Sequence, residues 1–228
     1  MAVPAFGASG TLGAASTGTS ISPALPSRAA GNLLVGIVAT KNNATHTWPA
    51  GWTKVSQTNS GASWTVSWAW RIATNTAADG PPSVSWTGSV ANTGQLWTYT
   101  GNDGSAPIGA ASAAATGTVS PHTSTSITST RDSSLAIYLD ACATNTALTT
   151  PSGYTSHVSS TSATSVTAIN SGDKTVTASG TATGAISTAG GAAAWVEIQV
   201  EILSPFSVLG MFSEHPVTMD VRRAVEYK

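Results

Sequence analysis

The sequence is poor in cysteine and in charge, and each shortage excludes a class of structure or partner. Cys142 is the only cysteine, so no disulfide can form within the chain. It lies in the mostly apolar run 135–143, where we expect a small buried side chain and no activated nucleophile. Only 8% of residues are charged and the formal net charge is -1, which gives no electrostatic reason to expect a nucleic acid as partner.

Long apolar runs are also missing. The longest, such as 33–39, are far too short to cross a bilayer, so no membrane insertion is expected. Residues 1–6 contain no basic stretch followed by an apolar segment, and we therefore expect no signal peptide. These features are typical of a protein made and assembled in a bacterial cytoplasm.

The sequence does contain clear alternation with a period of two residues. Apolar and polar residues alternate in 64–71 and again in 196–202. A strand places the apolar residues of such a segment on one side, whereas a helix would distribute them around its circumference. No segment before residue 205 has a sustained helical period. The chain is therefore predicted to be all-β.

The two halves of the sequence resemble each other. Three matches occur in the same order: 34–38 with 135–139, 49–53 with 151–155, and 96–99 with 194–197. Their spacings are 101, 102 and 98 positions. The middle match pairs Pro-Ala-Gly-Trp-Thr with Pro-Ser-Gly-Tyr-Thr. We interpret this series as an internal repeat, about 10–108 and 109–204.

The repeat allows two architectures. Each half could be a small β domain, or the halves could interleave into one two-sheet sandwich. We favour the second, a jelly-roll-like antiparallel β-sandwich over residues 1–204. The segment between the halves supports it, because 118–120 and 126–128 are typical of strands and not of a linker.

Residues 205–228 differ in composition from the rest. They concentrate charged and apolar side chains, and two prolines interrupt them. This composition predicts a C-terminal arm that docks on a partner, while a free end or a strand folded back on the sandwich stays open. The candidate docking residues are Phe206, Leu209, Met211, Phe212, Arg222 and Arg223.

No group of residues predicts catalysis. The four histidines are scattered without metal-ligand spacing, and most acids before the arm occupy turn positions, where they cap the backbone. Asp140, at the end of an apolar run, is the one acid that we expect to be partly buried. The Gly-rich segment 184–191 lacks the lysine of a phosphate loop. We expect no enzyme, no catalytic residue, no metal site and no cofactor.

Eight tryptophans stand out against this background, seven of them in the first half. Trp64, Trp68 and Trp70 share one strand face, so we expect them to fill a core. Trp48 and Trp52 flank a turn and are the candidates for stacking against a sugar ring. They support an alternative function, a carbohydrate-binding module for attachment to a host surface.

An ordered series of motifs resembles a family of bacterial and phage β-sandwich modules. The motifs are Gly31-Asn32-Leu33-Leu34-Val35, Pro49-Ala50-Gly51-Trp52-Thr53, Trp70-Arg71-Ile72-Ala73, Ser83-Val84-Ser85-Trp86-Thr87-Gly88 and the segment from Tyr99 to Ile108. Members of the family typically have G-D-L-L, P-x-G-W-T, W-R-x-A, S-W-T-G and Y-x-G-V-D-x-x-x-P-I. The resemblance covers about residues 7–203, with Asn32 and Asn102 standing where Asp and Val are usual.

The resemblance implies a structural protein on the exterior of a tailed-phage particle, as a capsid decoration, head-fibre or tail-associated protein. Its partners would be other capsid or tail subunits in the virion, with a host-surface glycan as a further partner. A homo-oligomer is expected, and a trimer is one of the oligomeric states that stay open. The family contributes no catalytic residues.

Overall fold

The computed structural model describes residues 3–74, 79–188 and 190–206, in which every regular element is a strand. The strands are β1 (Ala5–Ser9), β2 (Gly13–Ala15), β3 (Ser20–Ile21), β4 (Leu33–Thr40), β5 (Thr53–Ser60), β6 (Trp64–Ile72), β7 (Val84–Ser85), β8 (Asn92–Thr100), β9 (Ile108–Ala111), β10 (Ala115–Gly117), β11 (His122–Ser124), β12 (Ser134–Cys142), β13 (Thr155–Ser162), β14 (Thr167–Val176), β15 (Ile186–Thr188) and β16 (Trp195–Ile202). Within these ranges no helix has the length and apolar character that a bilayer crossing requires.

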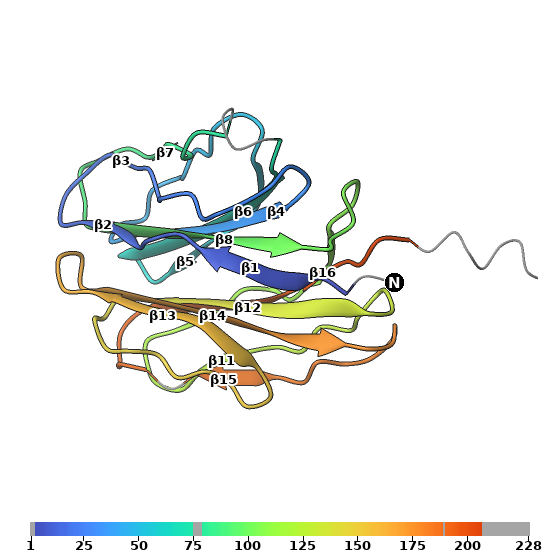
Figure 1. Ribbon diagram of the computed structural model, residues 1–228. Coiled ribbons are helices and arrows are strands. Elements are labelled where there is room, and N and C mark those ends of the chain that lie inside the picture. The colour runs from blue at the N-terminus through green and yellow to red at the C-terminus, as the bar shows by residue number, and fades with distance from the viewer. Residues whose placement is uncertain (1–2, 75–78, 189, 207–228) are drawn as a thin grey trace, which may run out of the picture.

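Two antiparallel six-stranded sheets form most of the molecule. The first has the order β1-β8-β4-β6-β5, with β2 also paired to β8, and the second has the order β10-β16-β12-β14-β13, with β9 also paired to β16. Figure 1 shows the sheets face to face, with the β3–β7 ribbon above the first and the β11–β15 ribbon below the second. The all-β prediction is confirmed. Each half supplies one whole sheet, so the halves do not interleave as a jelly-roll-like order would require.

The strand pairing of one sheet repeats in the other. Residue n of the first half corresponds to residue n + 102 as far as β5, and to n + 103 from β6 onward. In the first sheet Leu33 pairs with Tyr99, and in the second Leu135 pairs with Ile202. The ribbons obey the same rule, since Ser20 pairs with Ser85 and His122 pairs with Thr188. The two halves are therefore copies of one structural unit.

The repeated turn before β5 and β13 is confirmed at the predicted spacing. Gly51 and Gly153 have φ values of 84° and 81°, a left-handed conformation that glycine adopts without steric cost. The amides of Trp52 and Tyr154 each donate to the carbonyl of the proline three residues earlier, at 3.2 Å. A β-bulge follows in both strands, between Lys54 and Ser56 in β5 and at the corresponding place in β13.

The other two sequence matches need correction. Leu135 corresponds to Leu33 and not to Leu34, because Leu33 and Leu135 are the pair that faces the core. Trp97 corresponds to Val200, and Trp195 lies in a separate cluster on the outer face of its sheet. An alignment of residue types alone does not take the pleat of a strand into account. A shift of the register by one residue moves a side chain to the opposite face of the sheet.

The segment between the halves joins the second sheet, as expected, but through other residues. Its strands are β9 and β10, which pair with β16, and β11, which pairs with β15. Residues 118–120 and 126–128 lie outside these strands, although Thr128 forms an isolated bridge with Ala182.

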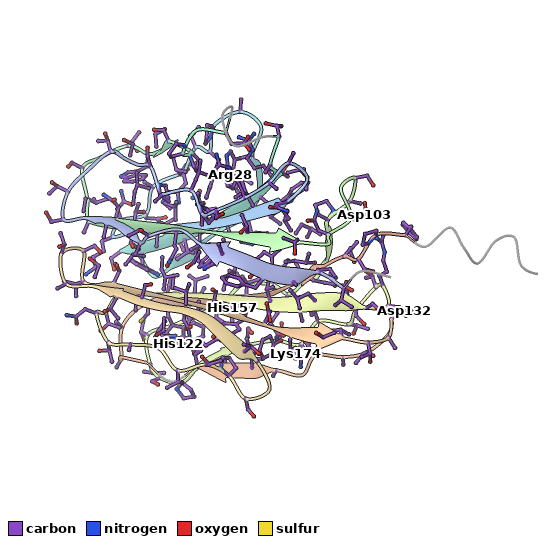
Figure 2. All side chains as sticks on the ribbon, viewed as in Figure 1. Arg28, Asp103, His122, Asp132, His157 and Lys174 are labelled. Atoms are coloured by element: carbon purple, nitrogen blue, oxygen red, sulfur yellow. The ribbon has the colours of Figure 1, made fainter. Side chains whose placement is uncertain are left out.

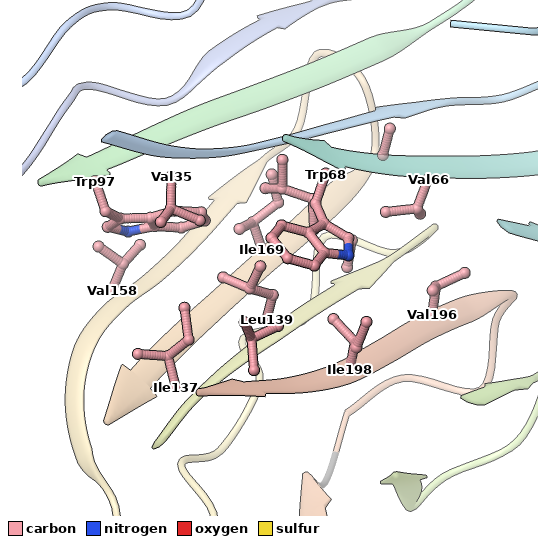
Figure 3. Packing of buried hydrophobic residues seen from close by; sticks show 14 of the residues in the cluster. Val35, Val66, Trp68, Trp97, Ile137, Leu139, Val158, Ile169, Val196 and Ile198 are labelled. Atoms are coloured by element: carbon pink, nitrogen blue, oxygen red, sulfur yellow. The ribbon is translucent and has the colours of Figure 1, made fainter. Parts of the chain in front are cut away.

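The core lies between the sheets, where both halves present the same face (Figure 3). The first half contributes Leu33, Val35, Ile37, Ala39, Trp64, Val66, Trp68, Trp97 and Tyr99, and the second contributes Leu135, Ile137, Leu139, Ala141, Val158, Ile169, Val196, Ile198, Val200 and Ile202. Contact through equivalent surfaces is the arrangement of an isologous dimer, here within one chain. The core role predicted for Trp64 and Trp68 is confirmed, and Trp70 packs against the same cluster.

The outer face of each sheet is also covered. The strands β4, β8, β12 and β16 are buried along nearly their whole length. Above the first sheet a smaller cluster includes Val38, Trp48 and Trp86, and below the second another includes Tyr138 and Tyr154. Polar residues on the outer faces of the central strands are therefore buried as well.

We predict that the two halves unfold together. Leu139→Ala removes a fully buried core side chain of the second half and should lower the free energy of unfolding by about 2–5 kcal/mol. Because seven of the eight tryptophans belong to the first half, tryptophan fluorescence should report the same shift in urea midpoint as circular dichroism.

A control is Val119→Ala, at a side chain that is 64% exposed, where no shift is expected. An unchanged fluorescence midpoint in Leu139→Ala would show instead that the halves are independent domains.

Candidate functional site

The C-terminal exit of the chain is the first candidate site, because Phe206 is a large apolar side chain left in solvent. It is 75% exposed. The Arg131 guanidinium lies 3.8 Å from the centre of its ring, in a cation–π contact. The other predicted docking residues, Leu209, Met211, Phe212, Arg222 and Arg223, lie outside the described residues.

Arg131 is held in place by the loop that follows β8. Its Nη1 donates to Asp103 Oδ2 at 2.6 Å and also to the Ser204 carbonyl. Asp103 Oδ1 accepts hydrogen bonds from the Ser105 amide and hydroxyl, and the Asp103 amide donates to the Leu203 carbonyl. Figure 2 shows Asp103 at the end of the sandwich that the chain reaches after β16.

The electrostatics of this exit follow from those contacts. The hydrogen bonds from Arg131 and Ser105 hold the pKa of Asp103 well below its usual range. Asp103 is therefore ionised at neutral pH, and its charge balances the guanidinium beneath Phe206. Asp103 was expected only as a turn residue, and in addition to capping the turn it orients the cation at the exit.

The second candidate site, the Trp48–Trp52 turn, lies on the outer face of the first sheet. Trp48 is only 9% exposed, and its Nε1 donates to the Ser67 hydroxyl at 2.9 Å. Trp52 is half-buried, with its ring 5.2 Å from that of Trp48 and tilted by 36°. Of the two candidate stacking residues, only Trp52 keeps substantial contact with solvent.

A buried histidine supports this turn from below. His46 is fully buried, and its ring nitrogens lie 2.8 Å from the hydroxyls of Thr40 and Ser67. Burial, with a smaller contribution from the Lys54 charge, lowers the pKa of His46 to about 4. The imidazole is therefore neutral at pH 7 and serves as a hydrogen-bonding bridge between strands.

The corresponding face of the second sheet carries a buried polar network that the sequence did not reveal. His122 Nδ1 and the Thr188 hydroxyl each lie 2.8 Å from Asp140 Oδ2. Thr188 Oγ1 is also 3.0 Å from Glu197 Oε1. All four residues are 0% exposed, which goes beyond the partial burial expected for Asp140.

The geometry of this network requires a proton on one carboxyl group. Asp140 and Glu197 are directly opposite in the β12–β16 pairing, where two like charges would repel each other. The Thr188 hydroxyl has one hydrogen and cannot donate to both acids. Donation by a protonated Glu197 to Thr188, and by Thr188 to Asp140, satisfies both contacts. Burial, followed by the nearby Asp140 charge, raises the pKa of Glu197 to about 9.

A second glutamate in β16, Glu201, is stabilised in its ionised form. Burial opposes ionisation of Glu201, but hydrogen bonds from Ala110 and Thr130 outweigh it and lower its pKa. The amide of Ala110 donates to Glu201 Oε2 at 3.0 Å, and the amide of Thr130 donates at 2.9 Å. The two glutamates lie on one face of one strand and differ in the donors that reach them.

Other reactive groups are buried or isolated. Burial raises the pKa of the Cys142 thiol to about 12, so it is not a thiolate at neutral pH. Asp173, expected at a turn, lies within β14, and its Oδ2 is 2.6 Å from His157 Nε2. Across the described ranges, no three His, Cys, Asp or Glu side chains are placed to hold a metal ion.

Comparison of the chain with protein-family models, with curated proteins and with solved structures found no match.

We predict that Glu197 makes stability fall as the pH rises. In the folded protein the carboxyl group binds a proton up to about pH 9, whereas in the unfolded chain it loses it near its ordinary value of 4.5. Between these values the folded state holds more protons, so this group should remove up to about 1.4 kcal/mol of stability per pH unit. Glu197→Gln should abolish that dependence and raise the urea midpoint at pH 8.

Glu201→Gln is the matched control. Its carboxylate is ionised and hydrogen-bonded, so the variant should lose stability at pH 7, where Glu197→Gln gains it. Urea unfolding at pH 5, 7 and 9 gives the free energy of unfolding at each pH. If this free energy changes with pH equally in wild type and in Glu197→Gln, the assignment of a proton to Glu197 in the folded protein is wrong.

Proposed function

We propose that the protein is a structural component on the exterior of a tailed-phage particle, acting by protein–protein contacts. The observation that carries the proposal is the chain exit. A sandwich with both sheet faces covered ends in an exposed aromatic side chain, Phe206, which Arg131 holds in place. The sequence that follows is the part of the chain richest in apolar and charged residues together.

This arrangement suits an attachment arm better than a catalytic role. Exposed apolar anchors surrounded by charge are typical of protein interfaces. The motif series from Gly31 to Ile108 adds its resemblance to phage and bacterial β-sandwich modules. The proposed partners are capsid or tail subunits of a virion that is assembled in the host cytoplasm. The chain itself is proposed to form a homo-oligomer, of which a trimer is one possibility.

The second candidate function is a carbohydrate-binding module for host attachment. The observation that favours it is the half-buried Trp52 ring, which remains accessible at the Gly51 turn. A solvent-accessible indole face is suited to stacking against a sugar ring. Loss of glycan binding in Trp52→Ala, with folding intact, would place the binding at this turn.

We predict that Phe206→Ala and deletion of residues 205–228 both leave the sandwich folded and reduce incorporation into particles. Phe206 is mostly exposed, so its removal should change the thermal midpoint by no more than about 1–2 °C. Incorporation is measured by mass spectrometry of purified particles of the phage whose genome encodes the variant.

Val119→Ala, at an exposed apolar residue outside the exit, should incorporate normally. Normal incorporation of the deletion variant would exclude the C-terminal arm as the anchor. Absence of the wild-type chain from purified particles would exclude the virion function itself.

A further inference from the structure

A crevice of about 530 Å³ lies between the two sheets at one edge of the sandwich. One wall is formed by residues 9–12, where β1 ends and the chain bends toward β2, and the other by residues 157–161 of β13. Gln95 of β8 is the deeply buried member of the lining, at 2% exposure. Figure 2 shows His157 at this edge, where β13 runs beneath β1.

The internal repeat allows the two edges of the sandwich to be compared. At the opposite edge β10 lies against β5, and the Ser60 hydroxyl donates to the Gly117 carbonyl at 3.0 Å. The corresponding residues at the crevice are Ser162 and Ala15. Among the described residues no hydrogen bond joins the strands that carry them. The two copies therefore meet differently at the two edges: a hydrogen bond joins β5 to β10, whereas Phe6 of β1 stacks on His157 of β13 beside the crevice, with ring centres 3.8 Å apart.

Gln95 differs from its counterpart in a way that fits a binding role. Its place in the other half is taken by Ile198, an aliphatic residue of the shared core. Gln95 Nε2 donates to the Gly10 carbonyl at 2.9 Å, whereas Oε1 has no hydrogen-bond partner within the described residues. A buried acceptor without a partner is unfavourable, and a ligand that donates a hydrogen bond would relieve this.

The rest of the lining defines the chemistry of that ligand. Four side chains with hydroxyl groups line the walls and form no hydrogen bond of their own within the described residues: Ser9, Thr11, Ser160 and Thr161. The one titratable lining residue is His157, and its Nε2 is already 2.6 Å from Asp173. Anions would need free cationic groups and metal ions would need free carboxylates. The lining offers neither, and it matches a neutral molecule rich in hydroxyl groups.

We propose that this crevice binds a neutral saccharide, with Gln95 Oε1 accepting a hydrogen bond from a sugar hydroxyl. The crevice is open to solvent, and its volume is in the range of clefts that hold small ligands. The site lies between β1 and β13, apart from the Trp52 turn and from the chain exit. It therefore does not depend on either function proposed above.

The test is binding of the intact chain to an array of neutral, sialylated and sulfated glycans, followed by calorimetric titration with the best neutral binder. Ser160→Tyr should fill the crevice and weaken binding at least tenfold. Thr58→Tyr is the matched control, because Thr58 is the counterpart of Ser160 on β5, and it should bind as wild type does. Thermal melting checks that both variants fold.

Gln95→Leu provides a second variant, which copies the aliphatic character of Ile198 and should also weaken binding at least tenfold. Three results would overturn the proposal: no neutral glycan is bound, anionic glycans are bound in preference, or Ser160→Tyr and Gln95→Leu both bind as wild type does. If Trp52→Ala alone abolishes binding, the saccharide site is the turn and not the crevice.

Discussion

Burial of the same apolar face of each half against the other is the interaction on which the rest of the structure depends. Leu33 and Leu135 are counterparts, and both lie in the one cluster that the sheets share. Neither sheet could bury this face alone, because the ribbons and loops of each half cover only its outer side. The common core sets the relative placement of the sheets, and this placement determines which strands meet at each edge of the sandwich.

The two copies have diverged on their outer faces. The first sheet carries Trp48 over a neutral His46, whereas the second carries Asp140 and Glu197 opposite each other on neighbouring strands. A buried carboxylate pair is tolerated only when one acid keeps its proton and the hydrogen bonds are shared correctly. The polar network makes the second half sensitive to pH in a way that the first half is not.

The candidate sites lie where the two copies of the repeat differ. Phe206 follows β16, the last strand of the described residues, and its counterpart in the first half is Asp103, in the loop that leads to β9. The crevice lies at the edge where β13 meets β1, and Gln95 stands there in place of the aliphatic Ile198. Equivalent faces of the two copies build the core, and the candidate binding surfaces lie where the copies differ.

The sequence by itself determined the all-β class, the two alternating strands β6 and β16, the aromatic core face of β6 and the turns at Gly51 and Gly153, because alternation and turns are local properties of a few neighbouring residues. Only the tertiary structure decided the register of the repeat and the separation of the halves into two sheets. It also decided that Asp173 and Glu197 are buried, because their covering comes from segments distant in the chain. The composition of a strand does not reveal whether its polar face meets water or another layer of protein.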